Sequence, residues 1–562
     1  MKFNKQGVFW IPEGYDISDL GGKAEHLIRN QDKILEAGFK MPEAVCIPWQ
    51  ELISIARENG IDENYEPDAF SAPNFFPLIN EKQTEIMKFI QEKITNPFLS
   101  SSSPDEDSFE ARMFGVYDSR QISPLHSYIE YDVDWEMYGD FFMEEVLSGD
   151  ILKDPDFGKH SIPGYKEKWL DLAQKFQDKE ISVEDVGKEA QIKGMSQSLS
   201  NIVASYYNPL GMGLRKKHSF EEKGMGILVR ETIGKEKEDH FPSERGFKEP
   251  EYSIIARTGY KEGILISITK GLGNNIVDGK GKSDSFIYNV KEDTYRKVTN
   301  QVLFDKEEID GVKQHEFNYY DEELLKQTGI SINDLGKMLT KLKEGINFPD
   351  THDVDFEMAV EDKDIFMLQS SPAKKVKNFK IVENENNLID PLYVMGSVKK
   401  NINKLLILPS PFFYSKDEKQ RLIWVQIAQW VSDFNKENKD YLIIGTPYLS
   451  KNDNFDLKYY YNAAGVIEFQ NFRDHYHFKN PLMHYNNLIR EEGMTFVVGY
   501  GINEFKSIVG EYIPQANDDG DIGCDILDGK LKPLDMIKVM DVDMTLETDE
   551  YAEKANLYFN EK

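Results

Sequence analysis

The sequence is poor in cysteine and in positive charge, and it has no long apolar run. Two cysteines, Cys46 and Cys524, are too few for a disulfide framework or a cysteine-based zinc site, so we expect them to be inert small side chains. Asp and Glu number 98 against 67 Lys and Arg, and the formal net charge is −31. A surface of this charge repels polyanions, so neither nucleic acid nor anionic membrane is an expected partner. No apolar stretch is long enough to cross a bilayer and no secretory leader is recognisable, so we expect a cytoplasmic protein.

The composition is that of a folded chain with more than one core. The sequence has 562 residues, of which 40% are hydrophobic and 12% are aromatic. These values exclude wholesale disorder, and the length allows two or more domains. Strand-like and helix-like periodicities both occur along the chain, so a mixed α/β fold is expected.

A β-hairpin with polar residues on one face is predicted from the run DVDFEMAVEDKDIFMLQSSP. Asp355 and Glu357 share a face of its first strand, because successive side chains of a strand point to opposite sides. The same alternation places Met367 and Gln369 on one face of the second strand, which is predicted to end at Pro372. Two carboxylates and an amide at one edge suit Mg²⁺ held between the protein and nucleotide phosphates. The alternative is a solvated hairpin whose polar residues face water.

A glycine pair near the start of the chain precedes a helical pattern. Gly21 and Gly22 are followed by Lys23, and the apolar residues of the predicted helix include Leu35. The helix is predicted to stop at Gly38. A glycine pair and a lysine at a helix start can hold phosphate through backbone N–H groups and a positive charge. An ordinary helix start is the alternative reading of the same residues.

Three further segments contain candidate binding residues. Phe98 and Leu99 are predicted to end a buried strand, and the four serines after them are predicted to form a polar loop. A short buried strand is predicted over residues 226–229, shortly before Glu231. Gly271 and Gly273 belong to a glycine-rich turn that lets the backbone approach a ligand closely.

These segments, spread over residues 18–375, resemble in the same order the ATP-binding domain of phosphoenolpyruvate synthase and pyruvate phosphate dikinase. The start LGGKAEHL is similar to the family's GGKGANL, and GLGNNIVDG is similar to G-L-G-E-x-V-V-x-G. The strand MGILVRE is similar to M-x-V-x-V-Q-E. The hairpin resembles the family's D-I-E followed by L-Q-x-R-P.

The resemblance implies an ATP-grasp-like fold that binds ATP and Mg²⁺. The residues that it assigns to the nucleotide are Lys23, Glu231, Asp355, Glu357, Gln369, Gly271 and Gly273. It assigns the metal to Glu357, Gln369 and Asp355. It also places Glu231 beside the adenine or ribose, at the end of a hinge strand.

The chain departs from the family at two phosphate-binding arginines. Ser100 stands at the arginine of V-R-S-S, and Ser371 stands at the arginine of L-Q-x-R-P. Serine can donate a hydrogen bond to phosphate but brings no charge, and charge neutralisation dominates phosphoryl transfer. Arg112 is close enough in sequence to Ser100 to be a possible substitute. The catalytic residues therefore remain unassigned.

We expect the dikinase-type ATP-binding domain to span residues 1–375, with a helical insert at about 128–191. A linker at 376–390 is predicted to lead into a second α/β domain at 391–515, followed by an acidic C-terminal segment at 516–562 that either packs on that domain or hangs free. In the second domain, the histidines His475, His477 and His484 allow a metal site, but ordinary surface or hydrogen-bonded histidines are the alternative.

Three hypotheses for the function follow. The chain is an ATP-dependent phosphotransferase that acts on a small molecule or on a partner protein with a phospho-accepting histidine. Alternatively, it is a nucleotide-binding pseudoenzyme with a regulatory role, or a structural interaction protein that inherited the fold. The family's swivelling domain, with its T-S-H-A signature, and its pyruvate-binding barrel are not recognisable in the sequence, so formation of phosphoenolpyruvate by this chain alone is not expected. The sequence gives no indication of the oligomeric state.

Overall fold

The fold is described here from a computed structural model. The structure describes residues 2–58, 81–105, 119–122, 152–153, 170, 173–175, 177–179, 183–207, 209–220, 224–236, 248–260, 263–273, 284–298, 330–346, 348–349, 352–375, 381–382, 384–407, 430, 433–435, 437–444, 462–469, 494–501, 537–549 and 554–560.

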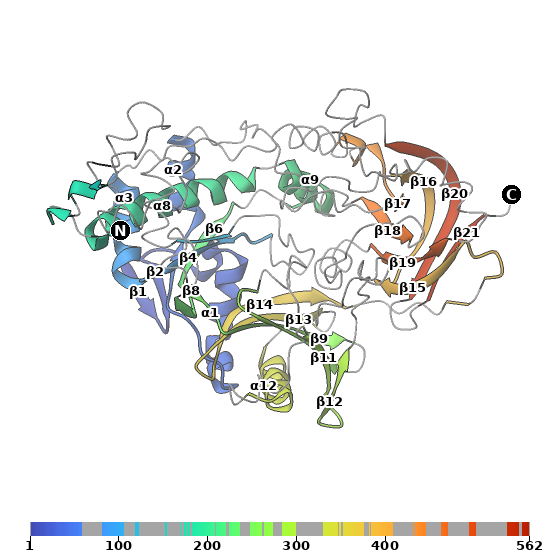
Figure 1. The fold of residues 1–562 in the computed structure, drawn as a ribbon, viewed down its shortest axis with the longest axis horizontal. Coiled ribbons are helices and arrows are strands. Elements are labelled where there is room, and N and C mark those ends of the chain that lie inside the picture. Colours follow the sequence, from blue (N-terminus) through green and yellow to red (C-terminus); the bar gives the residue numbers. More distant parts are fainter. Residues whose placement is uncertain are drawn as a thin grey trace.

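Six strands form the first sheet, here called the N-terminal sheet, in the order β1-β2-β3-β6-β4-β5. Figure 1 labels β1, β2, β4 and β6 of this sheet, at the end of the molecule where the N-terminus lies. They are β1 Phe3–Gln6, β2 Phe9–Pro12, β3 Ala44–Ile47, β4 Pro97–Ser102, β5 Ser119–Gln121 and β6 Gly226–Glu231. β2 and β3 run parallel, and all other neighbouring strands of this sheet run antiparallel. β6 and β4 are inner strands, and both contribute to the site described below.

Helices cover both faces of the N-terminal sheet. They are η1 Ile17–Leu20, α1 Gly22–Glu36, α2 Trp49–Glu58, α3 Glu81–Lys93, α8 Val183–Tyr206 and α9 Pro209–His218. On one face, α1 packs with Cys46 and Leu228. On the other face, α3 and α8 contact each other and pack with Leu99 and Val229. Strand alternation therefore gives each face of β6 its own core.

The prediction for α1 is confirmed at its end but wrong at one residue. Gly38 follows the helix with φ +100°, a left-handed conformation that favours glycine at a helix end. Leu35, expected on the apolar face, is 49% exposed. Ile34, the residue before it, is fully buried. The apolar face of the helix therefore includes Ile34 but not Leu35.

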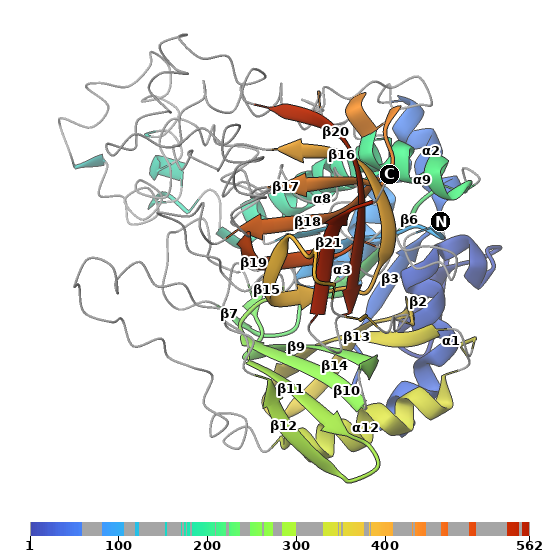
Figure 2. The same cartoon turned by 90° about the vertical axis from the view of Figure 1, so that its right-hand side faces the viewer.

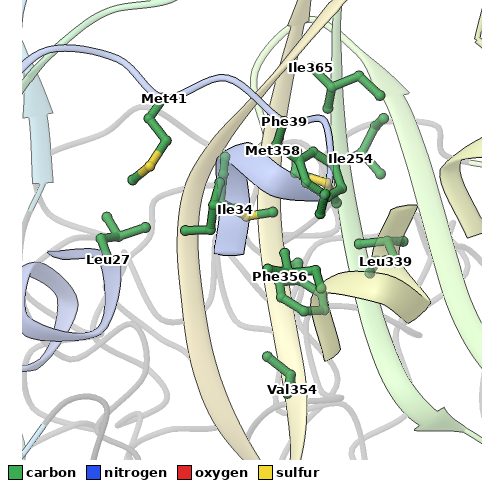
Figure 3. Close-up of a cluster of buried hydrophobic side chains, with 14 of the residues drawn as sticks. Leu27, Ile34, Phe39, Met41, Ile254, Leu339, Val354, Phe356, Met358 and Ile365 are labelled. Atoms are coloured by element: carbon green, nitrogen blue, oxygen red, sulfur yellow. The ribbon is translucent and has the colours of Figure 1, made fainter. Parts of the chain in front are cut away.

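Six antiparallel strands form the second sheet, here called the central sheet, in the order β12-β11-β10-β9-β13-β14. They are β9 Tyr252–Tyr260, β10 Gly263–Lys270, β11 Asp284–Asn289, β12 Thr294–Val298, β13 His352–Glu361 and β14 Asp364–Lys374. Helix α12 Ile332–Gly345 and helix α1 pack on one face of this sheet, where Phe356, Leu339 and Ile34 meet (Figure 3). The opposite face carries the polar residues of the hairpin.

The hairpin β13–β14 has a bulge that alternation alone did not predict. Its two-residue turn, Asp362–Lys363, has positive φ at both positions, which matches the twist of antiparallel strands. The register shifts between Glu357 and Met358, which pair with Gln369 and Met367, so Leu368 is the extra residue. Met367 therefore points into the core while Gln369 lies on the opposite face beside Glu357.

Two further details of the sequence prediction are wrong. β14 continues through Pro372, which pairs with Val354. Proline is tolerated here because β14 is an edge strand, where a residue without an N–H group can face away from the sheet. Residues Ser100–Ser102 are part of inner strand β4 rather than a polar loop, and all three are buried. Two of the buried hydroxyls have partners: Oγ of Ser101 accepts from Nζ of Lys23, and Oγ of Ser102 accepts from the amide of Ala24.

A third sheet, here called the C-terminal sheet, has seven strands in the order β15-β19-β18-β17-β16-β20-β21 (Figure 2). They are β15 Ile389–Met395, β16 Lys399–Ile407, β17 Tyr441–Ile444, β18 Ala463–Phe469, β19 Phe496–Gly501, β20 Lys538–Asp549 and β21 Lys554–Phe559. Its central strands run parallel, and antiparallel strands flank them on both sides. β20 pairs with β16, so the end of the chain contributes two strands to this sheet.

The prediction of a mixed α/β protein is confirmed by these sheets and helices. In the described parts of the chain, every helix is too short or too polar to span a bilayer. The histidines His475, His477 and His484 lie outside the described residues.

Candidate functional site

Two cross-strand rows of polar residues lie on the face of the central sheet opposite its core. In the first row, Asp355 of β13 pairs with Arg257 of β9 on one side and with Ser371 of β14 on the other. In the second row, Glu357 pairs with Gln369 of β14. The structure thus brings together the four hairpin positions that the sequence singled out, because their strands are neighbours in the sheet.

Arg257 is a member of this site that sequence reasoning missed. Its Nε atom lies 3.5 Å from Oδ1 of Asp355, and both side chains are less than a tenth exposed. In the sequence, Arg257 only follows the apolar run 254–256, and it is the pairing of β9 with β13 that places it beside Asp355. A buried carboxylate without a nearby cation is costly, and the guanidinium of Arg257 offsets part of that cost for Asp355.

Glu357 and Gln369 provide two adjacent oxygen ligands. Directly paired residues of antiparallel strands have Cβ atoms about 5 Å apart, so one small cation can contact both side chains. Mg²⁺ binds through few protein oxygens and keeps waters and phosphate oxygens as its other ligands, so this pair fits it. Asp355 lies in the next row beside Arg257. Among the residues that the structure describes, no three His, Cys, Asp or Glu side chains cluster closely enough to form a metal site by themselves.

A second arginine that the sequence reasoning missed reaches the hairpin from the N-terminal sheet. Arg230 of β6 donates a hydrogen bond from Nη1 to the backbone oxygen of Leu368, with a length of 2.7 Å. Its guanidinium lies over the ring of Phe98, 5.0 Å from the ring centre. Desolvation lowers the pKa of Arg230 from 12.5 to about 10, and the negative charge of Glu357 opposes this effect. The contact joins the two sheets next to Gln369.

The start of α1 packs tightly against the end of β4. Gly21 has φ +83°, and a Cβ atom there would lie 1.5 Å from the backbone oxygen of Ser102. The amide of Gly22 donates to the oxygen of Ser103 at 3.2 Å, and the amide of Ala24 donates to Oγ of Ser102 at 3.1 Å. Two amides of the predicted phosphate-binding turn are therefore bonded within the protein.

Lys23 lies at the same junction. Its Nζ atom donates to Oγ of Ser101 over 3.4 Å. Ser101 is the residue after Ser100, so Lys23 lies beside the segment where the family has its first arginine. The lysine thus brings positive charge to the β4 end of the site.

Glu231 binds the loop that precedes β4. Its Oε2 accepts from the amides of Thr95 and Asn96 at 2.7 and 3.1 Å. Its Oε1 accepts from Nδ2 of Asn96 at 3.3 Å and from Nζ of Lys248 at 3.2 Å. Both carboxylate oxygens therefore hold the end of the hinge strand in place, and their role toward adenine or ribose stays a prediction.

The glycine turn at Gly271 is held by an acidic side chain. Lys248 and Glu249 form strand β8, which pairs with β7 Lys235–Glu236. Oε1 of Glu249 accepts from the amide of Leu272 at 3.3 Å, between Gly271 and Gly273. Lys248 and Glu249 thus link the Glu231 end of the site to the glycine turn. Arg112, the possible substitute for the lost arginine, lies outside the described residues.

Comparison with known proteins defines the family of the first two thirds of the chain. The family model described as "Pyruvate phosphate dikinase, AMP/ATP-binding domain" matches residues 17–388. No curated protein shows a significant match.

Two of the solved structures to which the chain is distantly similar are ATP citrate lyases. A structure from Methanothrix soehngenii in complex with citrate and coenzyme A is 10% identical and covers 51% of this chain and 75% of that one. A variant from Methanosaeta concilii in complex with (3S)-citryl-CoA is 10% identical and covers 49% and 72%. Each TM-score is 0.13, which is too low to support an argument.

Proposed function

Because the chain belongs to the pyruvate phosphate dikinase AMP/ATP-binding domain family, we propose that it binds ATP with Mg²⁺ at the polar face of the β13–β14 hairpin and acts as an ATP-dependent phosphotransferase. The observation that carries this proposal is the cross-strand pairing of Glu357 with Gln369, with the guanidinium of Arg230 at the neighbouring Leu368. Oxygen ligands and a cation at one place are what a metal-bound triphosphate requires.

In this proposal, residues of the N-terminal sheet and of the central sheet bind different parts of the nucleotide. Glu357 and Gln369 hold Mg²⁺, which when bound neutralises phosphate charge during transfer. Lys23 supplies a positive charge from the start of α1. The hinge strand that ends at Glu231 lines the base, and the turn of Gly271 and Gly273 lies against the phosphates. Asp355, neutralised by Arg257, borders the metal ligands.

The acceptor of the phosphoryl group is a small molecule or a histidine of a partner protein. Both fit a site in which the protein positions the phosphates and contributes charge, because phosphoryl transfer needs little covalent chemistry from the protein. The net charge of −31 makes a polyanionic acceptor such as nucleic acid unfavourable.

A nucleotide-binding pseudoenzyme is the second candidate, and a specific observation favours it. Ser100 and Ser371 are 3% and 1% exposed, and they stand where the family has arginines. Losing one charged contact to a transferring phosphoryl group commonly costs about 10²-fold or more in rate. In this case ATP binding would be retained while turnover is slow, and the bound nucleotide would regulate a partner.

Calorimetric titration with Mg-ATP, followed by mass spectrometry of the nucleotide and the protein, tests both candidates. Binding with appearance of ADP or AMP and of a phosphorylated product supports the phosphotransferase. Binding without turnover supports the pseudoenzyme. Glu357→Gln should weaken Mg-ATP binding, whereas Glu292→Gln, an exposed carboxylate in the β11–β12 turn of the same sheet, should not. Absence of ATP binding by the intact protein would overturn the proposed function.

A further inference from the structure

Arg230 lies on the same face of the N-terminal sheet as Ser100, the position at which the family has its first phosphate-binding arginine. Ser100 of β4 pairs with Leu228 of β6, and Phe98 of β4 pairs with Arg230 of β6. Leu228 belongs to the core on the α1 side of the N-terminal sheet. Because side chains two residues apart on a strand share a face, Ser100 and Arg230 lie on this side together. Diagonal neighbours of this kind are about 7 to 8 Å apart, within reach of a long side chain.

The surroundings of Arg230 differ from those of a structural arginine. Its side chain is half-buried, and none of the described carboxylates lies within ion-pair distance of it. Glu357 is near enough to influence its charge but does not pair with it directly. Its acceptor in the described chain is the oxygen of Leu368, although a guanidinium has five N–H donors. A partly desolvated cation for which the described residues supply one hydrogen-bond acceptor is a favourable place for an anion.

The position of Arg230 also fits a phosphate rather than a base. It precedes Glu231, the end of the hinge strand, and it reaches across to β14 beside Gln369. The guanidinium therefore lies between the strand that is expected to line the adenine and the pair expected to hold the metal. A planar guanidinium binds phosphate oxygens through two parallel hydrogen bonds, which a serine or a lysine cannot reproduce.

We propose that Arg230 is the phosphate-contacting arginine of this chain and takes the place of the family arginine that is missing at Ser100. This inference rests on the proposed function, because it assigns a residue to the same nucleotide site. The positive charge that contacts the phosphates would then come from β6 rather than from the neighbouring strand β4, on the same face of the sheet. The ligand that Arg230 recognises is the phosphate chain of a nucleoside triphosphate.

The test compares the affinities for Mg-ATP and for adenosine in the full chain. Arg230→Gln should weaken Mg-ATP binding about tenfold or more and leave adenosine binding within about twofold, because the lost charge-assisted contact is made to phosphate alone. Arg120→Gln is the matched control: Arg120 of β5 pairs with Leu99, so it lies on the opposite face of the same sheet. This control should bind both ligands as the wild type does.

The outcomes separate this inference from the proposed function. If the wild type binds Mg-ATP but Arg230→Gln binds it equally well, or loses ATP and adenosine binding alike, Arg230 is structural and the inference is wrong. If the wild type binds no ATP, the proposed function is wrong as well. Should Arg230→Gln fail to fold, as judged by its thermal unfolding, Arg230→Lys provides the same comparison. It keeps the charge but loses the bidentate geometry, so a selective loss of ATP affinity is again expected.

Discussion

Arg257 and Asp355 form a buried ion pair between strands β9 and β13, with Nε 3.5 Å from Oδ1. The pair lies on the polar face of the central sheet, one row from Glu357 and Gln369. Its burial means that each charge depends on the other, since neither is well solvated. It therefore contributes to the fold and to the charge balance of the site together.

Replacing one partner of this ion pair should destabilise the protein more than replacing both partners with apolar residues. We expect Asp355→Asn to lower the free energy of unfolding by about 3 kcal/mol, because the buried guanidinium of Arg257 loses the negative charge 3.5 Å from its Nε atom. The double variant Arg257→Met/Asp355→Leu should recover most of that loss. Urea unfolding followed by circular dichroism measures both. The exposed cross-strand pair of Lys404 and Asp541 is the control, and Asp541→Asn should change the free energy by about 1 kcal/mol or less.

The close contact between α1 and β4 predicts a large cost for a side chain at Gly21. Gly21 and Gly14 both have positive φ, at +83° and +90°. A Cβ atom at Gly14 meets nothing within 4 Å, whereas at Gly21 it meets the oxygen of Ser102 at 1.5 Å. Gly14→Ala should therefore cost about 1 kcal/mol, from backbone strain alone, and Gly21→Ala about 3 kcal/mol or more. Equal losses in chemical denaturation would mean that α1 does not approach β4 this closely.

Glu249 should oppose nucleotide binding if the turn of Gly271 and Gly273 contacts the phosphates. Its carboxylate accepts from the amide of Leu272, in the middle of that turn, where it would repel a phosphate. Glu249→Gln keeps an acceptor for the amide but removes the charge, so Mg-ATP should bind more tightly, by about threefold to tenfold. Glu236→Gln, on the partner strand of the same two-stranded sheet, is the control and should have little effect. Unchanged affinity in Glu249→Gln would place the phosphates elsewhere.

Local patterns predicted several elements well because their causes are local. The end of α1 at Gly38 follows from glycine's access to positive φ, and the strand predicted over residues 226–229, which is part of β6, follows from its short apolar run. The alternation that grouped Asp355 with Glu357 also holds, because both precede the bulge.

Features that depend on pairing between distant segments were not predictable in this way. The bulge at Leu368 moved Gln369 to the face of Glu357, and no single-strand pattern contains that information. Ser101 and Ser102 of β4 are polar in sequence, but hydrogen bonds from Lys23 and Ala24 of α1 allow their burial in a strand. Arg257 and Arg230 reach the hairpin only through sheet pairing and through contact between sheets, so neither stands out in the sequence.

Tyr15 gives the fold a stability contribution that should disappear at alkaline pH. Its hydroxyl donates to Oε1 of Glu51 in the first turn of α2, at 2.6 Å, and ties the segment before η1 to that helix. This hydrogen bond, together with burial and the charge of Glu51, raises the pKa of Tyr15 from 10.0 to about 12. The protonated hydroxyl is thus favoured in the folded state. The contribution is fully present below pH 10 and is lost as the pH rises from 10 through 12.

The comparison of wild type with Tyr15→Phe isolates this contribution. At pH 8, we expect Tyr15→Phe to lower the free energy of unfolding by about 2 kcal/mol, the value typical of a hydrogen bond to a charged group. At pH 11.5 the difference should be clearly smaller, because wild-type Tyr15 then loses its proton on unfolding. Other groups titrate in both proteins and cancel in the difference. In a Glu51→Gln background, the effect of Tyr15→Phe on the free energy of unfolding should be smaller at pH 8 and should change less with pH. If the effect of Tyr15→Phe in the wild-type background is the same at pH 8 and at pH 11.5, Tyr15 and Glu51 are not coupled.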